Sequence, residues 1–479
     1  MIAKLASGLS LLTVLSHNAP EVNYDPCLRS SYLGTYGSQS VFMPRMSCYT
    51  ERGLTSLLGK LDADIPSLND GDALVWVEEA SIDYDLLSGP WPSVLGVSAY
   101  LELLDTLSGE VQYGSNSAQE TLALPASYKV LHQTERTALL ALPQQLAYQL
   151  SDVLPPTWKL YALPSEPLEL AAFSLAPASE ELLGPVRAAL SNLKFNPDVA
   201  RIVDSIDSKQ MLADVQWLSG EDPESPIVSR HSFSEGSRQA ADWLKDEIES
   251  TGAICELRPF LIGFAPNVIC RYPSTVNTTG TVLISGHYDS RGSFGSPRAP
   301  GADDDGSGTT GVLNIARTIG KLGVTFRSNV EIVTFAGEEQ GLYGSRYYSK
   351  DLKEEGKNLT LMIQADMTAY HVPGEPMQLG LPETIGTPEV TQLVANITAI
   401  YAPELKVGYS SACCSDHQSF WSQGFPASQV FERAGPIADP MYHNSGDLSE
   451  RVGYDVEQAR SIAKVQFATI LHTAGFDLP

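Results

Sequence analysis

The sequence predicts an α/β protein with a mostly parallel-centred mixed sheet flanked by helices, preceded by a smaller α+β or mostly β domain. From about residue 199 onward, apolar runs bounded by glycine alternate with helical patterns, which is typical of parallel strands joined by helices. Before that point, many prolines separate short apolar runs of strand length, such as residues 73–77 and 138–142. A chain of 479 residues is also too long for one ordinary domain. We therefore expect an N-terminal domain over residues 20–198 and a second domain over residues 199–479.

The second domain shows a regular succession of candidate elements. Its candidate strands are residues 281–285, 330–336, 359–365 and 427–431. Its candidate helices are residues 237–250, 307–322, 341–355, 388–401 and 456–471. In such folds the chemistry gathers beyond the carboxyl ends of the strands, so polar residues directly after a strand are the first candidates for a site.

The balance of charge excludes some classes of partner. The chain carries 57 acidic and 31 basic residues, which gives a formal net charge of −26, and 43% of its residues are hydrophobic. Nucleic-acid binding depends on clustered Lys and Arg, so we expect no nucleic acid as a partner. The apolar content is too high for a disordered chain. We also expect the protein to be a monomer.

The N-terminus predicts export. An apolar stretch over residues 5–15 follows Lys4 and precedes a polar segment, which is typical of a signal peptide, here residues 1–19. The stretch is too short to span a bilayer, and a buried N-terminal helix is the alternative. Glycosylation sequons at Asn277, Asn358 and Asn396 agree with a secreted, extracellular protein. No other run reaches 18 apolar residues, so we expect no membrane span.

The six cysteines form an even number, as is common in an oxidising compartment. We expect Cys27 to pair with Cys48 and Cys255 with Cys270, since each pair would close a local loop. Cys413 and Cys414 are adjacent, and they would need a strained vicinal bridge or remain thiols.

Two polar clusters follow the first candidate strand. His287 stands at its end and Asp289 two residues later, an arrangement in which Asp takes the second N–H of a metal-bound imidazole. Residues 303–305 are three consecutive Asp at the start of a helix. Helix capping by Asp305 explains only one of these carboxylates, whereas a divalent cation would offset the repulsion among all three. The spacing does not fit an EF-hand loop.

Further clusters follow the later strands. Glu338 and Glu339 are adjacent, so that one is able to bind a metal while the other acts as a general base on metal-bound water. Asp366 closes the next apolar strand, and His443 lies in a turn near the C-terminus. Two imidazoles and three carboxylates from successive loops suit two Zn²⁺ ions that share a carboxylate. Such a pair activates water and polarises a carbonyl, which predicts hydrolysis.

In their order along the chain, these motifs resemble those of the secreted dinuclear zinc aminopeptidases, peptidase family M28, which includes bacterial and fungal leucyl aminopeptidases. The resemblance covers residues 200–479 and implies that they form a zinc peptidase catalytic domain with the zinc exopeptidase fold. It implies two Zn²⁺ per chain, one held by His287, Asp304 and Asp366 and the other by Asp304, Glu339 and His443.

The resemblance also implies roles for individual residues. Asp304 would bridge the two ions, and its peptide bond to Asp305 is expected to be cis. Glu338 would be the general base and proton shuttle, and Asp289 would orient His287. These two residues are our catalytic candidates beside the metal ligands.

Other parts of the chain match the family's pattern or depart from it. Residues 229–232, 267–269 and 415–420 are further similarities, which favour His417 as a framework residue. Bacterial relatives space two cysteines around an aromatic residue that helps to stabilise the oxyanion, whereas Cys413 and Cys414 are adjacent here. Tyr409 and Tyr442 are therefore alternative candidates for that role.

The N-terminal domain shows none of the motifs. It is an accessory domain or a pro-domain, and its size favours a retained domain with its own core.

The sequence thus predicts a secreted zinc-dependent aminopeptidase that acts on peptides or proteins with a free N-terminus. A carboxypeptidase or dipeptidase on the same scaffold, or a single-zinc glutaminyl cyclase, is the enzymatic alternative. A binding ectodomain that has lost catalysis is the non-enzymatic one. The chain contains neither the G-x-S-x-G motif of serine hydrolases nor an H-E-x-x-H motif.

Overall fold

A computed structural model of the chain describes residues 12–16, 26–45, 48, 71–87, 128–168, 178–293, 295–412 and 414–479. Contacts divide the chain into two compact units, one of Met1–Ala80 and Tyr84–Glu169 and the other of Ser81–Asp83 and Leu170–Pro479. The second unit thus begins earlier than residue 199. The reason is that helices α8 (Glu180–Asn192) and α9 (Pro197–Asp204) bury Val186 and Val199 in the core of this unit.

The described part of the first unit is rich in β-structure, as predicted. Its two sheets are antiparallel, and helix α7 (Gln144–Val153) packs against strands β4 (Asp72–Glu79), β6 (Thr137–Pro143) and β7 (Trp158–Ala162) over a core that includes Val75 and Trp158. The short helices are α2 (Pro26–Arg29) and α5 (Tyr84–Leu87). One sheet has the order β1 (Thr13–Ser16), β3 (Gln39–Phe42), β2 (Tyr32–Tyr36), and the other the order β5 (Lys129–Gln133), β6 (Thr137–Pro143), β4 (Asp72–Glu79), β7 (Trp158–Ala162).

Strand β1 lies within the segment expected to be a signal peptide. Residues Thr13–Ser16 pair with Gln39–Phe42 of β3 at the edge of the three-stranded sheet. Cleavage after residue 19 would remove this edge strand. The signal peptide therefore stays a prediction, and sequencing the N-terminus of the exported protein tests it.

The second unit is built on a six-stranded mixed sheet. Its strands β16, β13, β10 and β12 are parallel, whereas β9 and β8 continue the sheet in antiparallel fashion. In spatial order they are β16 (Ala427–Val430), β13 (Leu359–Ala365), β10 (Thr281–His287), β12 (Asn329–Phe335), β9 (Asn267–Tyr272) and β8 (Ile254–Arg258). Two-stranded sheets pair β14 (Gln378–Pro382) with β15 (Lys406–Ser410) and β11 (Thr325–Phe326) with β17 (Phe476–Asp477).

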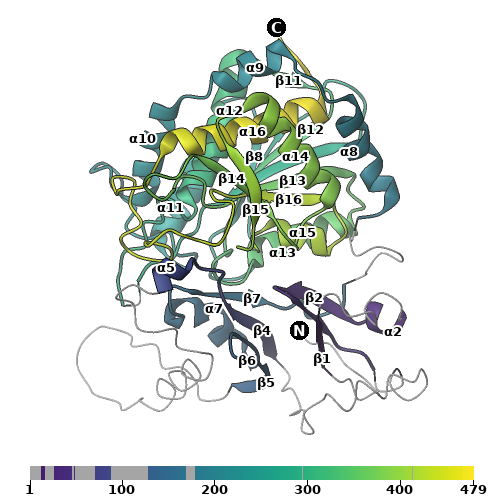
Figure 1. The fold of residues 1–479 in the computed structure, drawn as a ribbon, viewed down its shortest axis with the longest axis vertical. Helices are drawn as coiled ribbons and strands as arrows, with labels where there is room; N and C mark the ends of the chain where they lie inside the picture. Colours follow the sequence, from purple (N-terminus) through teal and green to yellow (C-terminus); the bar gives the residue numbers. More distant parts are fainter. Residues whose placement is uncertain are drawn as a thin grey trace. The chain divides into compact units, whose positions relative to one another are not determined.

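Helices cover both faces of this sheet (Figure 1). Helices α12 (Gly306–Leu322) and α16 (Val456–Ala474) pack on each other and against β10, on the face that contains Ile332 of β12. On the opposite face, α15 (His417–Ser422) packs against β13, β16 and α13 (Tyr343–Glu354), and its Phe420 contacts Phe335 of β12. The helices of this unit that follow α9 are α10 (Ser208–Ser219), α11 (Glu235–Glu249), α12 (Gly306–Leu322), α13 (Tyr343–Glu354), α14 (Pro388–Tyr401), α15 (His417–Ser422) and α16 (Val456–Ala474).

The parallel strands bring the loops that follow them to one edge. In the register of the sheet, His287 of β10 lies opposite Phe335 of β12, and Ser285 lies opposite Gln364 of β13. The residues that follow these strands therefore leave the sheet side by side. Gly286 allows α12 to approach β10, because a Cβ at this position would lie 2.8 Å from the backbone nitrogen of Thr309.

Both expected disulfides are present. Cys27 is bonded to Cys48, and Cys255 to Cys270, which lie directly opposite each other on β8 and β9. Cys414 is also disulfide-bonded, whereas Cys413 lies outside the described residues.

Among the sequons, Asn277 and Asn358 are exposed, whereas Asn396 is half-buried within α14. Across the described residues, no helix has the length and apolar character that crossing a membrane requires.

Candidate metal centre

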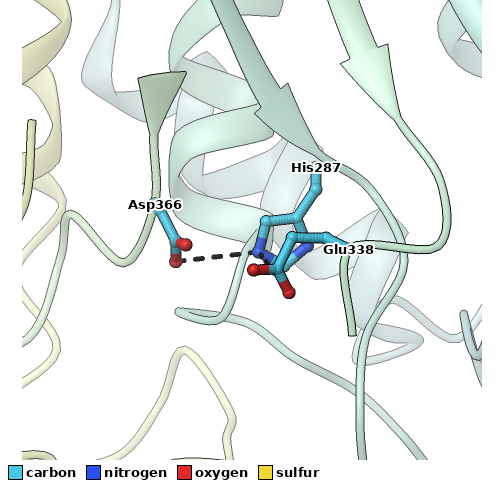
Figure 2. Close-up of side chains that lie close together, drawn as sticks. All are labelled: His287, Glu338 and Asp366. Atoms are coloured by element: carbon cyan, nitrogen blue, oxygen red, sulfur yellow. Dashed lines mark ion pairs between the residues drawn. The ribbon is translucent and has the colours of Figure 1, made fainter. Parts of the chain in front are cut away.

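The five predicted ligands and Glu338 meet at the carboxyl edge of the parallel strands. They form two buried groups, each with ligand atoms within 4.8 Å of one another, and the groups are His287 with Glu338 and Asp366, and Asp304 with Glu339 and His443. The first group is drawn in Figure 2, where the Asp366 and Glu338 carboxylates approach the His287 ring from the segments that follow β13 and β12, respectively. His287 Nε2 lies 3.6 Å from Asp366 Oδ1 and 4.0 Å from Glu338 Oε2.

Asp304 stands between the two groups. Its Oδ1 lies 3.4 Å from Nε2 of His287, and its Oδ2 lies 3.3 Å from Nε2 of His443. Nε2 of His443 also lies 3.1 Å from Oε2 of Glu339. One carboxylate therefore presents a separate oxygen to each imidazole, which is the geometry of a bridging ligand.

The loop that carries Asp304 is held by two neighbouring carboxylates. The peptide bond between Asp304 and Asp305 is cis, as expected. Asp305 caps helix α12 by accepting the N–H of Gly308 at 3.0 Å, and it also accepts the N–H of His287 at 2.9 Å and of Met367 at 3.1 Å. This single side chain thus ties together the loops after β10 and β13 and the start of α12.

Asp447 holds the same loop from the other side. Its carboxylate accepts the backbone N–H of Asp303 at 3.1 Å and of Asp304 at 3.0 Å, and Arg451 donates to it at 2.9 Å. Arg451 also binds the carboxylate of Asp439. Asp447 lies in the same turn as His443, and the sequence predicted no role for it.

Asp289 acts differently from the sequence-based expectation. Nδ1 of His287 lies 3.1 Å from the backbone oxygen of Asp289, whereas the Asp289 carboxylate is 3.6 Å away. That carboxylate instead accepts the backbone N–H of Glu338 at 3.3 Å and of Glu339 at 3.2 Å. Asp289 therefore orients His287 mainly through its main chain and the two Glu residues through its side chain.

Two residues of the centre adopt a backbone conformation that is rare outside glycine. His443 has φ = 53°, and Met367, which follows Asp366, has φ = 51°. Positive φ costs energy in residues with a Cβ and is concentrated at functional sites. Both conformations help to turn a ligand toward the centre.

The centre fits divalent metal ions. Nε2 of His287 and Oε1 of Glu339 are buried and have no hydrogen-bond partner, so each leaves a lone pair directed into a cluster of carboxylates. Unpaired buried polar atoms are costly, and a cation coordinated there would remove that cost. Imidazole nitrogen and carboxylate oxygen are ligands of Zn²⁺ in open sites.

The electrostatics of the metal-free centre show how strongly these groups interact. Burial alone would raise the pKa of Asp304, but the neighbouring imidazoles of His287 and His443 hold it well below its usual value. Burial alone would lower the pKa of His287, but Glu338 and the neighbouring carboxylates raise it well above its usual value.

A buried arginine supplies fixed positive charge nearby. Arg230 is fully buried, and its guanidinium donates to the backbone oxygens of Tyr288, Leu218, Pro300 and Gly301. Burial lowers its pKa to about 10, so it stays charged at neutral pH. In the sequence, residues 229–232 stand out only as a similarity to the family, because the partners of Arg230 are main-chain atoms that no side-chain pattern reveals.

The remaining candidates lie in different environments. Tyr442 is buried and stacks on His443, with ring centroids 3.7 Å apart, whereas Tyr409 is 65% exposed on β15. His417 is buried at the start of α15, and its Nε2 lies 3.0 Å from the backbone oxygen of Ile385, as suits a framework residue.

A mixed α/β sheet whose parallel strands end in a buried cluster of imidazoles and carboxylates defines a hydrolase of the metal-dependent class. Comparison with known proteins agrees. Residues 267–468 match the profile of peptidase family M28. Leucine aminopeptidase 1 of Chaetomium globosum is 30% identical over 299 residues, which cover 57% of this chain and 72% of the relative. Leucine aminopeptidase 1 of Phaeosphaeria nodorum is 31% identical over 281 residues, 54% of this chain and 69% of the relative.

The chain therefore belongs to peptidase family M28, which confirms the family and the peptidase class predicted from the motifs. Among solved structures, the LapA aminopeptidase of Legionella pneumophila is similar in fold, with a TM-score of 0.59 and 18% identity over 84% of this chain and 98% of that one. LapB of the same organism has a TM-score of 0.58 and 16% identity over 84% and 100% of the two chains. Because 84% exceeds the share of residues 199–479, the likeness in fold extends into the N-terminal part.

Proposed function

We propose that the protein is a secreted aminopeptidase that uses two Zn²⁺ ions to release N-terminal residues from peptides. The observation that carries this proposal is Asp304, whose two carboxylate oxygens face different imidazoles, with a further carboxylate beside each imidazole. The relatives named leucine aminopeptidase support the choice of reaction within the family.

Two sets of residues would hold the ions. His287, Asp304 and Asp366 would hold one, and Asp304, Glu339 and His443 the other. Bound there, zinc supplies a Lewis acid for the scissile carbonyl and lowers the pKa of water.

The chain's own groups would do the rest. Glu338 lies 4.0 Å from His287 Nε2, and its backbone N–H donates to Asp289. This position supports Glu338 as the group that would take a proton from water and return it to the leaving nitrogen. The buried carboxylates of the centre would attract the free ammonium of a substrate. Tyr442, stacked on His443, is better placed beside the centre than the exposed Tyr409 to contact the carbonyl oxygen.

Features outside the site support an extracellular, oxidising location for the protein. Two disulfides between described residues and two exposed sequons fit a secreted glycoprotein. The first unit has a core of its own, which supports an accessory domain that stays with the enzyme after export. A mature enzyme that lacks residues 20–198 would contradict this part of the proposal.

The test combines metal content with substrate choice. We expect elemental analysis of the purified protein to find two zinc ions per chain, and we expect free-amine chromogenic peptides to be cleaved while N-blocked peptides are not. Cleavage should stop on chelation and return with Zn²⁺. One zinc together with cyclisation of N-terminal glutamine would identify a glutaminyl cyclase, and cleavage of blocked peptides alone would identify a carboxypeptidase or an endopeptidase.

A further inference from the structure

An aromatic cluster of the second unit lies against the segment that carries Glu338. Its rings come from the turn before α11, from the segment between β8 and β9, and from the first turns of α13. Neighbouring rings have centroids between 4.5 Å and 6.1 Å apart, as is usual for aromatic pairs. The cluster consists of His231, Phe233, Phe260, Phe264, Tyr343 and Tyr347.

The aromatic cluster touches the main chain directly before Glu338. A Cβ at Gly337 would lie 3.0 Å from Cε1 of Phe264 and 3.4 Å from Cζ of Phe260, so both rings rest on this glycine. The N–H of Gly337 donates to Oγ of Ser232 at 2.8 Å, and Ser232 belongs to the same turn as two rings of the cluster. The rings are therefore held beside Glu338 by packing and by a hydrogen bond.

Part of the aromatic cluster faces solvent. Tyr347 is 40% exposed, and the side chains of Phe233 and Phe260 are half-buried. Ile262, in the same segment as Phe260, is fully exposed. Exposed apolar side chains that gather beside a polar site are typical of a surface that binds a ligand.

The reaction determines which part of a substrate would lie there. In the proposed function, Glu338 returns a proton to the nitrogen of the leaving peptide, so this nitrogen has to come within hydrogen-bond reach of Glu338. The free amine and the first side chain of the substrate lie on the other side of the scissile bond. The second residue of the substrate, which begins the leaving peptide, therefore comes to lie on the side of Glu338 and of the aromatic cluster.

We propose that the aromatic cluster binds the side chain of the second residue of the substrate and favours peptides in which that residue is large and apolar. The inference rests on the proposed function and adds to it a choice of the residue that follows the scissile bond. Burial of an apolar side chain against aromatic rings changes an equilibrium constant by about 10-fold. A peptide whose second residue is phenylalanine should therefore have a kcat/KM about 10 times that of a peptide with glycine there.

The experiment measures release of free leucine from leucyl-phenylalanine amide and from leucyl-glycine amide by the full-length enzyme. The two substrates share the first residue and lack a C-terminal carboxylate, so the ratio of their kcat/KM values reports on the second side chain alone. In the wild type this ratio should be about 10.

Two variants and a control test the role of the rings. Phe260→Ala should bring the ratio close to 1, and Tyr347→Ser, which removes a more exposed ring, should lower it about 2- to 3-fold. Phe195→Ala is the matched control, because Phe195 is also an exposed ring that stacks on a second ring, that of Tyr401 at 5.9 Å. This control should leave the ratio unchanged.

The outcomes separate this inference from the proposed function. A ratio near 1 in the wild type overturns the inference and leaves the aminopeptidase standing. An equal loss for both peptides in Phe260→Ala also overturns it, because the ring then only supports the main chain of Glu338. Release of leucine from neither peptide overturns the proposed function and this inference with it. Phe260 also packs against the core, so if Phe260→Ala fails to fold, the ratio in Tyr347→Ser decides: an unchanged ratio refutes the inference, and a lower one supports it.

Discussion

Replacing Asp447 by Asn should impair both stability and catalysis, although Asp447 is not a predicted metal ligand. Its two carboxylate oxygens accept the N–H groups of Asp303 and Asp304 and a hydrogen bond from Arg451. The amide group of Asn offers one acceptor oxygen in place of two and turns two hydrogens toward these donors. A buried donor left without a partner costs about 1 to 3 kcal/mol, and we expect a loss of that size in the free energy of unfolding.

The effect on activity would come from displacement of Asp304. A shift of about 1 Å in a catalytic group costs on the order of 100-fold in rate, so kcat/KM should fall by about that factor. Burial raises the pKa of Asp447 to about 6, yet Arg451 and two N–H donors favour its charged form at neutral pH, where the assay is done.

The assay compares Asp447→Asn with Asp207→Asn in urea unfolding, zinc content and cleavage of a free-amine chromogenic peptide. Asp207 also accepts two backbone N–H groups, those of Lys209 and Gln210, but at the exposed start of helix α10. Asn caps helices about as well as Asp, so the free energy of unfolding of this control should fall by less than about 0.5 kcal/mol. Its activity should be unchanged. An Asp447→Asn enzyme that is less stable but retains wild-type kcat/KM and both metals would refute the reasoning.

Three further changes have clear expected results. Glu338→Gln should keep both metals and lose nearly all turnover in the peptide assay, because the amide cannot take a proton from water; an unchanged rate would exclude Glu338 as the base. Removing the metal with a chelator should lower the melting temperature measured by calorimetry, since zinc at about 100 times its dissociation constant contributes about 2.7 kcal/mol to stability; equal melting temperatures would count against a metal site. In the first unit, burial raises the pKa of Glu78 from 4.5 to about 7, so the folded state holds a proton that the unfolded state releases between these values. The free energy of unfolding of this unit should therefore fall by up to about 3 kcal/mol as pH rises from 4.5 to 7. Hydrogen exchange in β4 measures this pH dependence, which should be absent in Glu78→Gln; a dependence that persists in this variant would contradict the assignment to Glu78.

Much of the second unit's sheet could be predicted from local patterns. The expected strands correspond to β10, β12, β13 and β16, because each is a short, fully buried apolar run bounded by glycine or polar residues. The expected helices correspond to α11, α12, α13, α14 and α16 within a few residues. β8 and β9 were not predicted as an antiparallel extension. β8 is half-exposed, so its residues lack the continuous apolar character of the central strands.

The candidate site could be predicted because its ligands follow parallel strands directly. Once β10, β12 and β13 are neighbours, geometry alone brings His287, Glu338, Glu339 and Asp366 to one edge. The Asp run 303–305 and His443 were also candidates from the sequence, and the resemblance to family M28 selected Asp304 within that run. In the structure, Asp304 lies 3.4 Å from Nε2 of His287 and 3.3 Å from Nε2 of His443.

The sequence by itself determined the kind of chemistry, because donor types and their positions after strands are local properties of the chain. Only the tertiary structure decided how the donors are held. Asp447 and Asp303 are 144 positions apart, and Arg291 and His443 are 152 positions apart, yet each pair is in hydrogen-bond contact. Such contacts depend on main-chain atoms and ring nitrogens brought together by folding, and no local pattern of residues encodes them.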